Sequence, residues 1–351
     1  MTQTIAGPTH GEPLDRANLA ELVLRLKALV FYRGLTSYAP FKAYIRLLDS
    51  LSDLDGNEES AQRAYAKWNS ALLAASPQAS WAYWLAGRII QSVNPLTIST
   101  DVNEAWQAAL EYELEALLAA IQCGGATLAS FIQKNSQLSA AACPVYDRGN
   151  EILASPEEGF CRSYLEMREK FVQYLPFDKQ IASTQLLAFH RRYGHGMPAV
   201  YKAMHAGPEG LIGITRLDPI MPEDLFDYSG NMDKLTANTE ALLSGGPASH
   251  VLLYGTRGCG KSSAVKSMLN RFEDRGLRLI EINPRHLQGL GDLMSRIERS
   301  NLFFILFIDD LSFKTTDTEY TELKSFLQGG AMDLPANCRI YVTSNRRHLV
   351  L

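Results

Sequence analysis

Apolar positions in the first half of the chain recur at the spacing of amphipathic helices. They predict one helix after another between about Leu14 and Ala206, with proline or glycine at several of the breaks. The expected helices cover residues 19–30, 38–54, 58–75, 78–93, 102–122, 126–134, 157–175, 179–193 and 197–205. No repeat of fixed period appears, which argues against a helical solenoid. We therefore predict a loose tail at residues 1–13 and an all-helical N-terminal domain at residues 14–210.

Glycine and proline interrupt this pattern between residues 207 and 227, and we place the domain boundary near residue 210. Beyond residue 250, short apolar runs alternate with helical patterns, as is typical of a parallel sheet with helices on both faces. The expected strands are 251–254, 277–282, 302–308 and 339–344, and the expected helices are 232–243, 261–274, 285–299 and 318–328. Residues 211–351 are therefore predicted to form an α/β domain.

A glycine-rich turn joins the first of these strands to a helix. It completes the pattern G-x-x-x-x-G-K-[ST] of a phosphate-binding loop, called Walker A. Its glycines let backbone N–H groups surround phosphate oxygens, and the helix N-terminus favours an anion. Lys261 can reach the β- and γ-phosphates, and the Ser262 hydroxyl can bind Mg²⁺. The predicted nucleotide-binding residues are Gly255, Thr256, Arg257, Gly258, Cys259, Gly260, Lys261, Ser262 and Ser263.

Polar residues follow two of the later strands. The apolar run 302–308 ends in Asp309 and Asp310, where a P-loop NTPase holds Mg²⁺ and orients the attacking water. The last strand ends at Asn345, whose amide can contact both the γ-phosphate and that water. Two structural alternatives stay open: the acids could cap the loop that begins at Leu311, and Asn345 could be an ordinary turn residue.

These features together resemble the core of an AAA+ ATPase. More narrowly, residues 253–263, 276–282, 307–313 and 341–349 resemble a bacterial AAA+ family catalogued as domain of unknown function 815. The resemblance covers about residues 215–351. It implies binding of ATP with Mg²⁺ and, in the complete domain, hydrolysis coupled to remodelling or loading of a partner macromolecule. It also implies a homo-oligomer of the AAA+ type.

The same resemblance implies a role for each residue of the predicted site. Lys261 would stabilise charge in the transition state, while Ser262 and Asp309 would place Mg²⁺. Asp310 and Asn345 would position the attacking water. Cys259 stands where threonine is more frequent, and a small packing residue is the simplest interpretation.

The sequence ends six residues after Asn345, whereas an AAA+ core continues into a fifth strand and a helical lid. We therefore expect that strand and the lid to be missing, which would leave strand 251–254 as an apolar edge. Arg346 and Arg347 are the remaining candidates for an arginine that acts on a neighbouring subunit's nucleotide. One alternative is a nucleotide-dependent scaffold with little or no turnover. Another is a partner of DNA resembling a helicase loader.

The composition changes this picture little. The chain is 46% hydrophobic and 21% charged with a net charge of −4, so no overall excess of basic residues points to nucleic acid. Five scattered cysteines without a C-x-x-C pair indicate a reducing, cytoplasmic compartment. No segment is predicted to span a membrane. The client, whether protein or nucleic acid, is not readable from the sequence.

Three features of the helical half have structural interpretations that require no functional site. Trp81 and Trp84 are spaced as core residues of a helix. His190 and His195 lack partners at metal-site spacing. The acidic run Glu111, Glu113 and Glu115 is predicted to be a solvated helix face.

Overall fold

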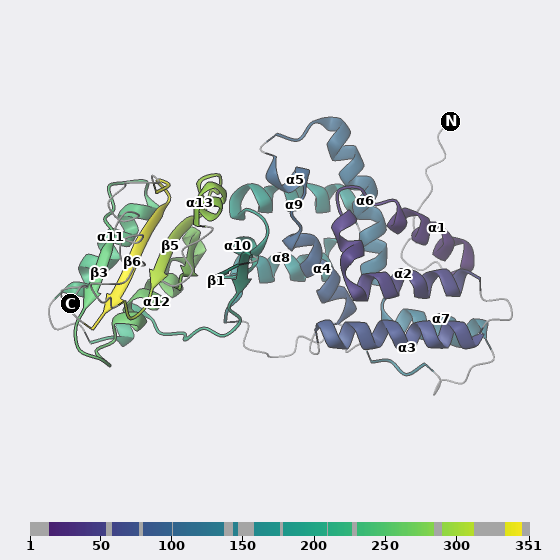
Figure 1. Ribbon diagram of the computed structural model, residues 1–351. Coiled ribbons are helices and arrows are strands. Elements are labelled where there is room, and N and C mark those ends of the chain that lie inside the picture. Colours follow the sequence, from purple (N-terminus) through teal and green to yellow (C-terminus); the bar gives the residue numbers. More distant parts are fainter. Residues whose placement is uncertain are drawn as a thin grey trace. The chain divides into compact units, whose positions relative to one another are not determined.

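The computed structural model describes residues 14–53, 58–76, 80–99, 101–136, 143–146, 158–175, 178–208, 210–226, 230–283, 290–311 and 334–345. The chain divides into two compact units (Figure 1). The first comprises the described residues of Met1–Ser155 and Leu165–His190, and the second those of Pro156–Tyr164 and Arg191–Leu351.

The described part of the first unit is helical, as predicted. Side chains of Asp15, Ser80, Asn94 and Asn103 accept hydrogen bonds from backbone N–H groups at four of its helix starts. Its helices are α1 (Arg16–Lys27), the 3-10 helix η1 (Arg33–Ser37), α2 (Ala39–Ser52), α3 (Glu58–Ala75), α4 (Trp81–Gln91), α5 (Pro95–Ile98), α6 (Glu104–Gln122), α7 (Gly125–Asn135), α8 (Arg162–Gln173, in this unit from Leu165) and α9 (Lys179–Tyr193, in this unit to His190).

Aromatic side chains form the centre of this unit. Trp81 is fully buried, stacks on Tyr44 with ring centroids 4.2 Å apart, and meets Trp68 edge-on at 5.4 Å. Its indole N–H donates to the carbonyl oxygen of Ala120 at 2.7 Å, which links α4 to α6. Trp84 is also buried. The prediction that both tryptophans are core residues is confirmed.

Replacing Trp81 with alanine should lower the free energy of unfolding of this unit by about 3–5 kcal/mol, because a fully buried indole and its hydrogen bond are lost. Urea unfolding followed by helical circular dichroism measures the change. Trp106→Ala is the matched control, since that indole is 38% exposed. The control should lose about 1 kcal/mol or less. Equal losses in the two variants would contradict the central role of Trp81.

The expectation that Glu111, Glu113 and Glu115 form a solvated face is wrong for Glu113, which is buried on α6. Its carboxylate accepts hydrogen bonds from the backbone N–H groups of Val30, Phe31 and Tyr32 at 2.9–3.1 Å. These N–H groups begin the turn that leads from α1 to η1, and a buried carboxylate satisfies them together. Glu115 forms ion pairs with Arg25 at 2.9 Å and Lys179 at 3.0 Å.

Among the described helices, no single one has the length and apolar character needed to cross a membrane. The pair α6–α7 meets that test only jointly, and it is bent by 73°.

The second unit is an α/β structure built on one mixed, mostly parallel sheet of six described strands. The strand order is β2-β1-β4-β5-β6-β3, and only β1 and β2 pair antiparallel. The strands are β1 (Ala203–Gly207), β2 (Gly210–Gly213), β3 (Val251–Tyr254), β4 (Leu277–Glu281), β5 (Phe303–Ile308) and β6 (Cys338–Ser344). The helices are α10 (Met197–Val200), η4 (Pro222–Asp224), α11 (Asn231–Leu243), α12 (Lys261–Phe272), η5 (Glu273–Arg275) and α13 (Leu290–Glu298).

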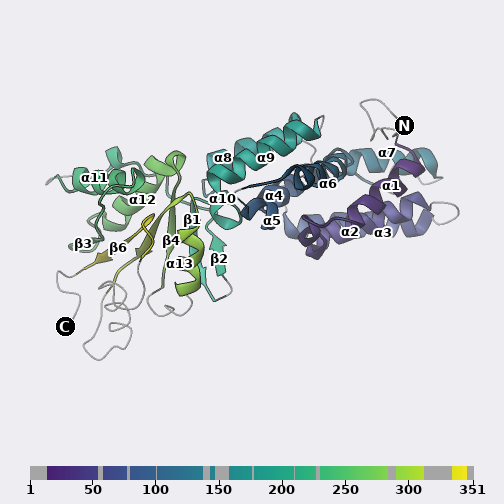
Figure 2. The same ribbon diagram turned by 90° about the horizontal axis from the view of Figure 1, so that it is seen from above.

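Helices cover both faces of this sheet (Figure 2). Ile305 and Phe307 of β5 pack in one cluster with α11 and α12, while Phe304, Leu306 and Ile308 pack in another with α13. Successive side chains of a strand point to opposite faces, so burial on both faces requires the continuous apolar run seen at residues 302–308. The predicted α/β architecture of this region is confirmed.

The prediction of a helix at 197–205 is wrong. The helix α10 ends at Val200, and the chain then enters β1, which pairs antiparallel with β2 so that Gly207 lies opposite Gly210. A β-carbon on Gly213 would collide with the ring of Tyr201, so the close packing of this hairpin requires glycine. The strand β1 pairs with β4, whose residues lie more than seventy positions later in the chain. The local spacing of apolar residues cannot predict such a pairing.

The units also divide the chain differently from the predicted boundary at residue 210. A cut there would separate β1 from β2. The short segment 156–164 also belongs to the second unit, ahead of residues that belong to the first. The Gly159 N–H donates to the carbonyl oxygen of Thr215 at 3.1 Å, and its carbonyl oxygen accepts from the Lys202 N–H at 2.9 Å. These bonds to distant residues take the place of helical ones, and the predicted helix 157–175 begins only at Arg162.

Candidate functional site

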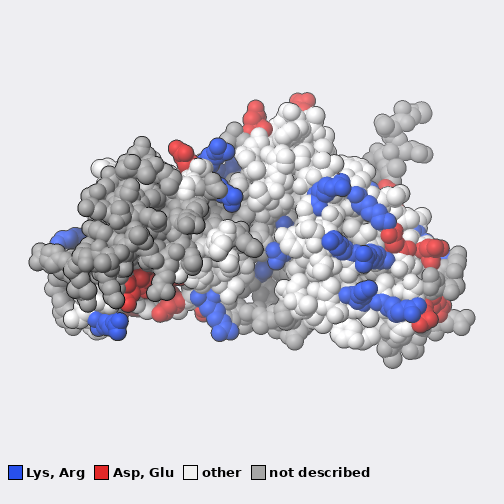
Figure 3. Space-filling view, viewed as in Figure 1, with Lys and Arg blue, Asp and Glu red and all other residues white. Residues whose placement is uncertain are grey.

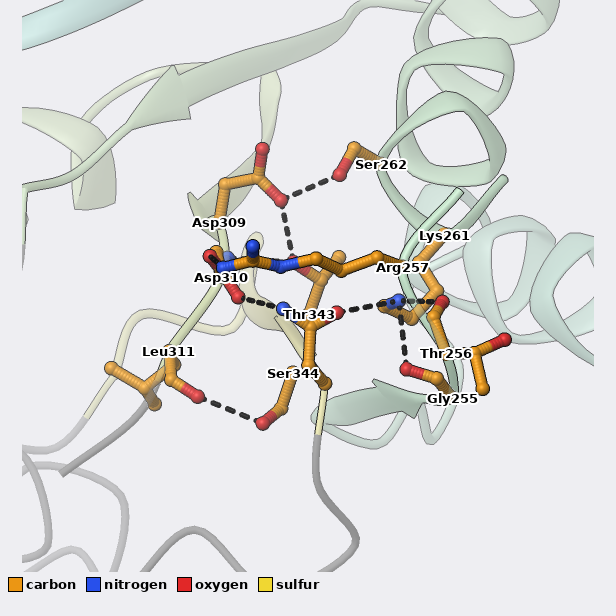
Figure 4. A network of polar contacts seen from close by, with 11 residues as sticks. Gly255, Thr256, Arg257, Lys261, Ser262, Asp309, Asp310, Leu311, Thr343 and Ser344 are labelled. Carbon is orange, nitrogen blue, oxygen red and sulfur yellow. Dashed lines mark hydrogen bonds and ion pairs between the residues drawn. The ribbon is translucent and has the colours of Figure 1, made fainter. Parts of the chain in front are cut away.

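The polar residues that the sequence singled out gather at one edge of the sheet. Strands β3, β6 and β5 are neighbours and run parallel, so their carboxyl ends lie side by side. The loop 255–260 follows β3, Asp309 and Asp310 follow β5, and Asn345 follows β6. Figure 4 shows Ser262 and Lys261 at the start of α12 facing the acids and Thr343 across this edge.

Two glycines of the loop before α12 have left-handed backbone angles. Gly258 and Gly260 have φ angles of +78° and +86°, in the left-handed region that favours glycine. Gly260 is the N-cap of α12 and offers no side chain to cap it. The free N–H groups of this helix start therefore remain available to a bound anion.

The Lys261 ammonium lies inside this loop. Its Nζ donates to the carbonyl oxygens of Gly255 at 3.0 Å and Thr256 at 2.8 Å, and to Asn345 Oδ1 at 3.1 Å. Carbonyl and amide oxygens thus occupy all three donors of the ammonium. A lysine held in this way keeps its positive charge against the glycine loop and Asn345.

Ser262 and Asp309 supply the oxygen atoms of the site that could bind a hard cation such as Mg²⁺. The Ser262 hydroxyl donates to Asp309 Oδ1 at 2.6 Å, and the Thr343 hydroxyl donates to the same oxygen at 2.5 Å. The described residues contain no group of three or more histidine, cysteine or acidic side chains arranged for a metal. One carboxylate and one hydroxyl are still a fitting protein contribution for Mg²⁺, which takes its other ligands from water and substrate phosphates.

Asp310 has the one positive φ found among described non-glycine residues, +52°. Such a backbone costs about 1–3 kcal/mol and tends to occur at functional sites. The Asp310 backbone N–H donates to Thr343 Oγ1 at 2.8 Å, and its Oδ1 accepts from Asn345 Nδ2 at 2.5 Å. Arg257 Nη2 lies 3.9 Å from the other carboxylate oxygen, and both groups are largely exposed. The strained residue therefore holds its carboxylate against Asn345.

Two described contacts bear on the structural alternatives for these residues. The Leu311 N–H donates to the carbonyl oxygen of Thr343 at 2.8 Å, so it is already satisfied by the backbone and not by either acid. The Asn345 side chain bridges Lys261 and Asp310, whereas an ordinary turn asparagine would bond its own backbone.

Other predicted residues lie at the loop or outside the described part. Cys259 is exposed, with its Sγ 3.7 Å from Lys261 Nζ, so it is not a packing residue. Ser263 follows Ser262 in the first turn of α12 and is half-buried. Arg346, Arg347 and the predicted helix 318–328 lie outside the described residues.

The sequence analysis missed Thr343. Its hydroxyl joins both acids, because it donates to Asp309 and accepts from the Asp310 N–H. The available signal for this contact was a hydroxyl residue near the end of β6, two positions before Asn345. Its contact with the acids could be inferred only from the pairing of β5 with β6.

Comparison with known proteins adds one result. Residues 197–351 match the family model described as "Protein of unknown function (DUF815)". No curated protein matches the chain. The match begins at the first residue of α10, so it includes the β1–β2 hairpin with the rest of the sheet.

Proposed function

We propose a function from the geometry of the strand ends. Residues 197–351 belong to the family described as a protein of unknown function, DUF815, and that description assigns no reaction. The chain is an ATP-binding protein of the P-loop, AAA+ type, and Mg²⁺-dependent ATP hydrolysis is its reaction. The observation that carries the proposal is the meeting of Lys261, the Ser262–Asp309 pair and the Asp310–Asn345 pair around one glycine loop.

Phosphate binding rests on the loop and on the lysine. The N–H groups of residues 256–262 and the N-terminus of α12 present positive partial charge to the β-phosphate. Lys261 exchanges its contacts with Gly255 and Thr256 for phosphate oxygens, since an anion is a stronger acceptor than a carbonyl.

Mg²⁺ fits beside this loop. Ser262 and Asp309 would hold it, and the ion would offset negative charge on the β- and γ-phosphates. The hydrogen bond from Thr343 orients the Asp309 carboxylate toward Ser262.

Hydrolysis rests on Asp310 and Asn345. The carboxylate of Asp310 accepts a proton from water while the water oxygen attacks the γ-phosphorus. The bond from the γ-phosphorus to the bridging oxygen breaks, and ADP and inorganic phosphate leave. The Asn345 amide orients the water and the γ-phosphate. The free energy released would drive movement of a macromolecular client by a cytoplasmic homo-oligomer.

Calorimetric titration with ATP tests the proposal. Binding should require Mg²⁺ for full affinity, and EDTA should weaken it. Ser262→Ala should reduce affinity in the presence of Mg²⁺ about tenfold, which corresponds to about 1.4 kcal/mol. It should change affinity in EDTA much less, since the hydroxyl acts through the ion.

Ser244→Ala, an exposed serine at the end of α11, is the matched control and should behave as the unmodified chain. Absence of ATP binding at millimolar nucleotide, with or without Mg²⁺, would refute the proposed function.

A further inference from the structure

The helices α2 and α3 of the first unit lie side by side (Figures 1 and 2), and side chains from both line an open groove. Its lining is small or cationic, with one acid: Ala43, Arg46, Asp49 and Ser50 of α2, and Ser60, Arg63, Ala64 and Lys67 of α3. None of these residues belongs to the proposed nucleotide site, which lies in the second unit.

Cations are repeated along both helices. Lys42 and Arg46 are four positions apart on α2, and Arg63 and Lys67 are four positions apart on α3. At 1.5 Å per residue, each pair spans about 6 Å along one helix face. All four side chains are exposed. We call these four residues the basic face.

Most of this positive charge is not neutralised. In the part of the chain that the structure describes, no ion pair connects Lys42, Arg46 or Lys67 to an acid. Arg63 pairs with Glu59 at 3.3 Å, but both groups are over 70% exposed, so the pair contributes little.

Acidic residues near the groove do not cancel this charge. Asp49, the one acid of the lining, is held by Lys27 at 2.6 Å. Figure 3 shows Lys and Arg side chains gathered over this side of the helical unit, with acidic ones toward one end. The basic face is thus a local positive surface on a chain whose net charge is −4.

The chemistry of the lining selects the class of partner. A lipid surface or a docked peptide needs an apolar anchor, yet the groove residues between the cations are alanine and serine. Small residues let an anion come close, and repeated cations match an anion that repeats. Tyr38, one turn before Lys42, does not serve as a stacking surface, because its ring packs edge-on against Trp84 at 6.0 Å and the Arg88 guanidinium lies 5.0 Å from its centroid.

We propose that the basic face binds single-stranded nucleic acid through its phosphodiester backbone. A positively charged groove can follow the phosphodiester backbone of a single strand, and α2 and α3 supply such a groove. The four cations predict a slope of log K against log salt of roughly −2.8, since each contact contributes about −0.7 on a single strand. Affinity should then fall about 50-fold between 50 and 200 mM salt.

Fluorescence anisotropy with the full chain and a labelled single strand of about 20 nucleotides and mixed sequence tests the proposal, without ATP. The double substitution R63Q/K67Q should weaken binding at low salt at least tenfold and reduce the slope by about 1.4. Thermal unfolding should be unchanged, because both side chains are exposed.

The matched control K134Q/K170Q removes the same charge from exposed positions on α7 and α8. It should leave affinity and slope as they are. Equal loss in the two double variants, or none in R63Q/K67Q, would overturn the proposal. So would tighter binding to the corresponding duplex, or binding to phosphatidylglycerol vesicles but not to the strand. K261A should still bind the strand, so the nucleotide and nucleic-acid proposals fail separately.

Discussion

Replacing Lys261 with alanine should reduce ATP affinity at least 100-fold. The ammonium donates to two loop carbonyls and to Asn345, in a position where phosphate oxygens would replace the carbonyls. A hydrogen bond to a charged group contributes about 1.5–3 kcal/mol, and two such bonds together account for a factor of 100 or more. Calorimetric titration with Mg²⁺-ATP measures the loss.

Lys266→Ala is the control from the same helix. The Lys266 ammonium lies 3.5 Å from Glu281 Oε1 and does not contact the loop. Its removal should leave ATP affinity within about twofold, as expected of a surface pair worth a few tenths of a kcal/mol. If both lysine variants bind ATP equally well, the nucleotide does not occupy the glycine loop.

Replacing Asp310 with asparagine should lower the rate of phosphate release about 100- to 10,000-fold, the usual contribution of a general base. Asparagine keeps the size of the side chain and can accept the hydrogen bond from Asn345, so ATP affinity should change little. Steady-state phosphate release gives kcat and KM, and a fall confined to kcat is the expected signature.

Asp274→Asn supplies the matched control, since that carboxylate is 61% exposed and pairs with Arg162 at 3.2 Å. It should leave turnover unchanged. An equal fall in both variants would remove Asp310 from the reaction. Tight ATP binding by the unmodified chain without any phosphate release would instead favour the nucleotide-dependent scaffold.

Much of the proposed site could be predicted from sequence because its parts are short and contiguous. The loop at 255–263 carries its geometry in its glycines, and Asp309 and Asp310 directly follow an apolar strand. The helices of the first unit were also predictable, since the repeat of apolar positions along a helix is local. Their ends shifted by a few residues where capping side chains such as Asn103 decided the start.

Features that depend on distant partners were not predictable. The charged run at 111–115 has the appearance of a surface, and only the turn after α1 makes Glu113 a buried acceptor. The four cations of the basic face are spread over two segments of sequence, and three of them, Arg46, Arg63 and Lys67, line one groove only because α2 packs on α3.

The sequence by itself determined the order of helices and strands from residue 231 to residue 281, the glycine loop, and the acids after β5. Each of these depends on neighbours within a few positions. The tertiary structure alone decided that residues 203–213 extend the sheet, that segment 156–164 joins the second unit, and that Thr343 connects the two acids. Those outcomes depend on backbone groups and side chains that find their hydrogen-bond partners far away in the chain, and local sequence carries no record of such partners.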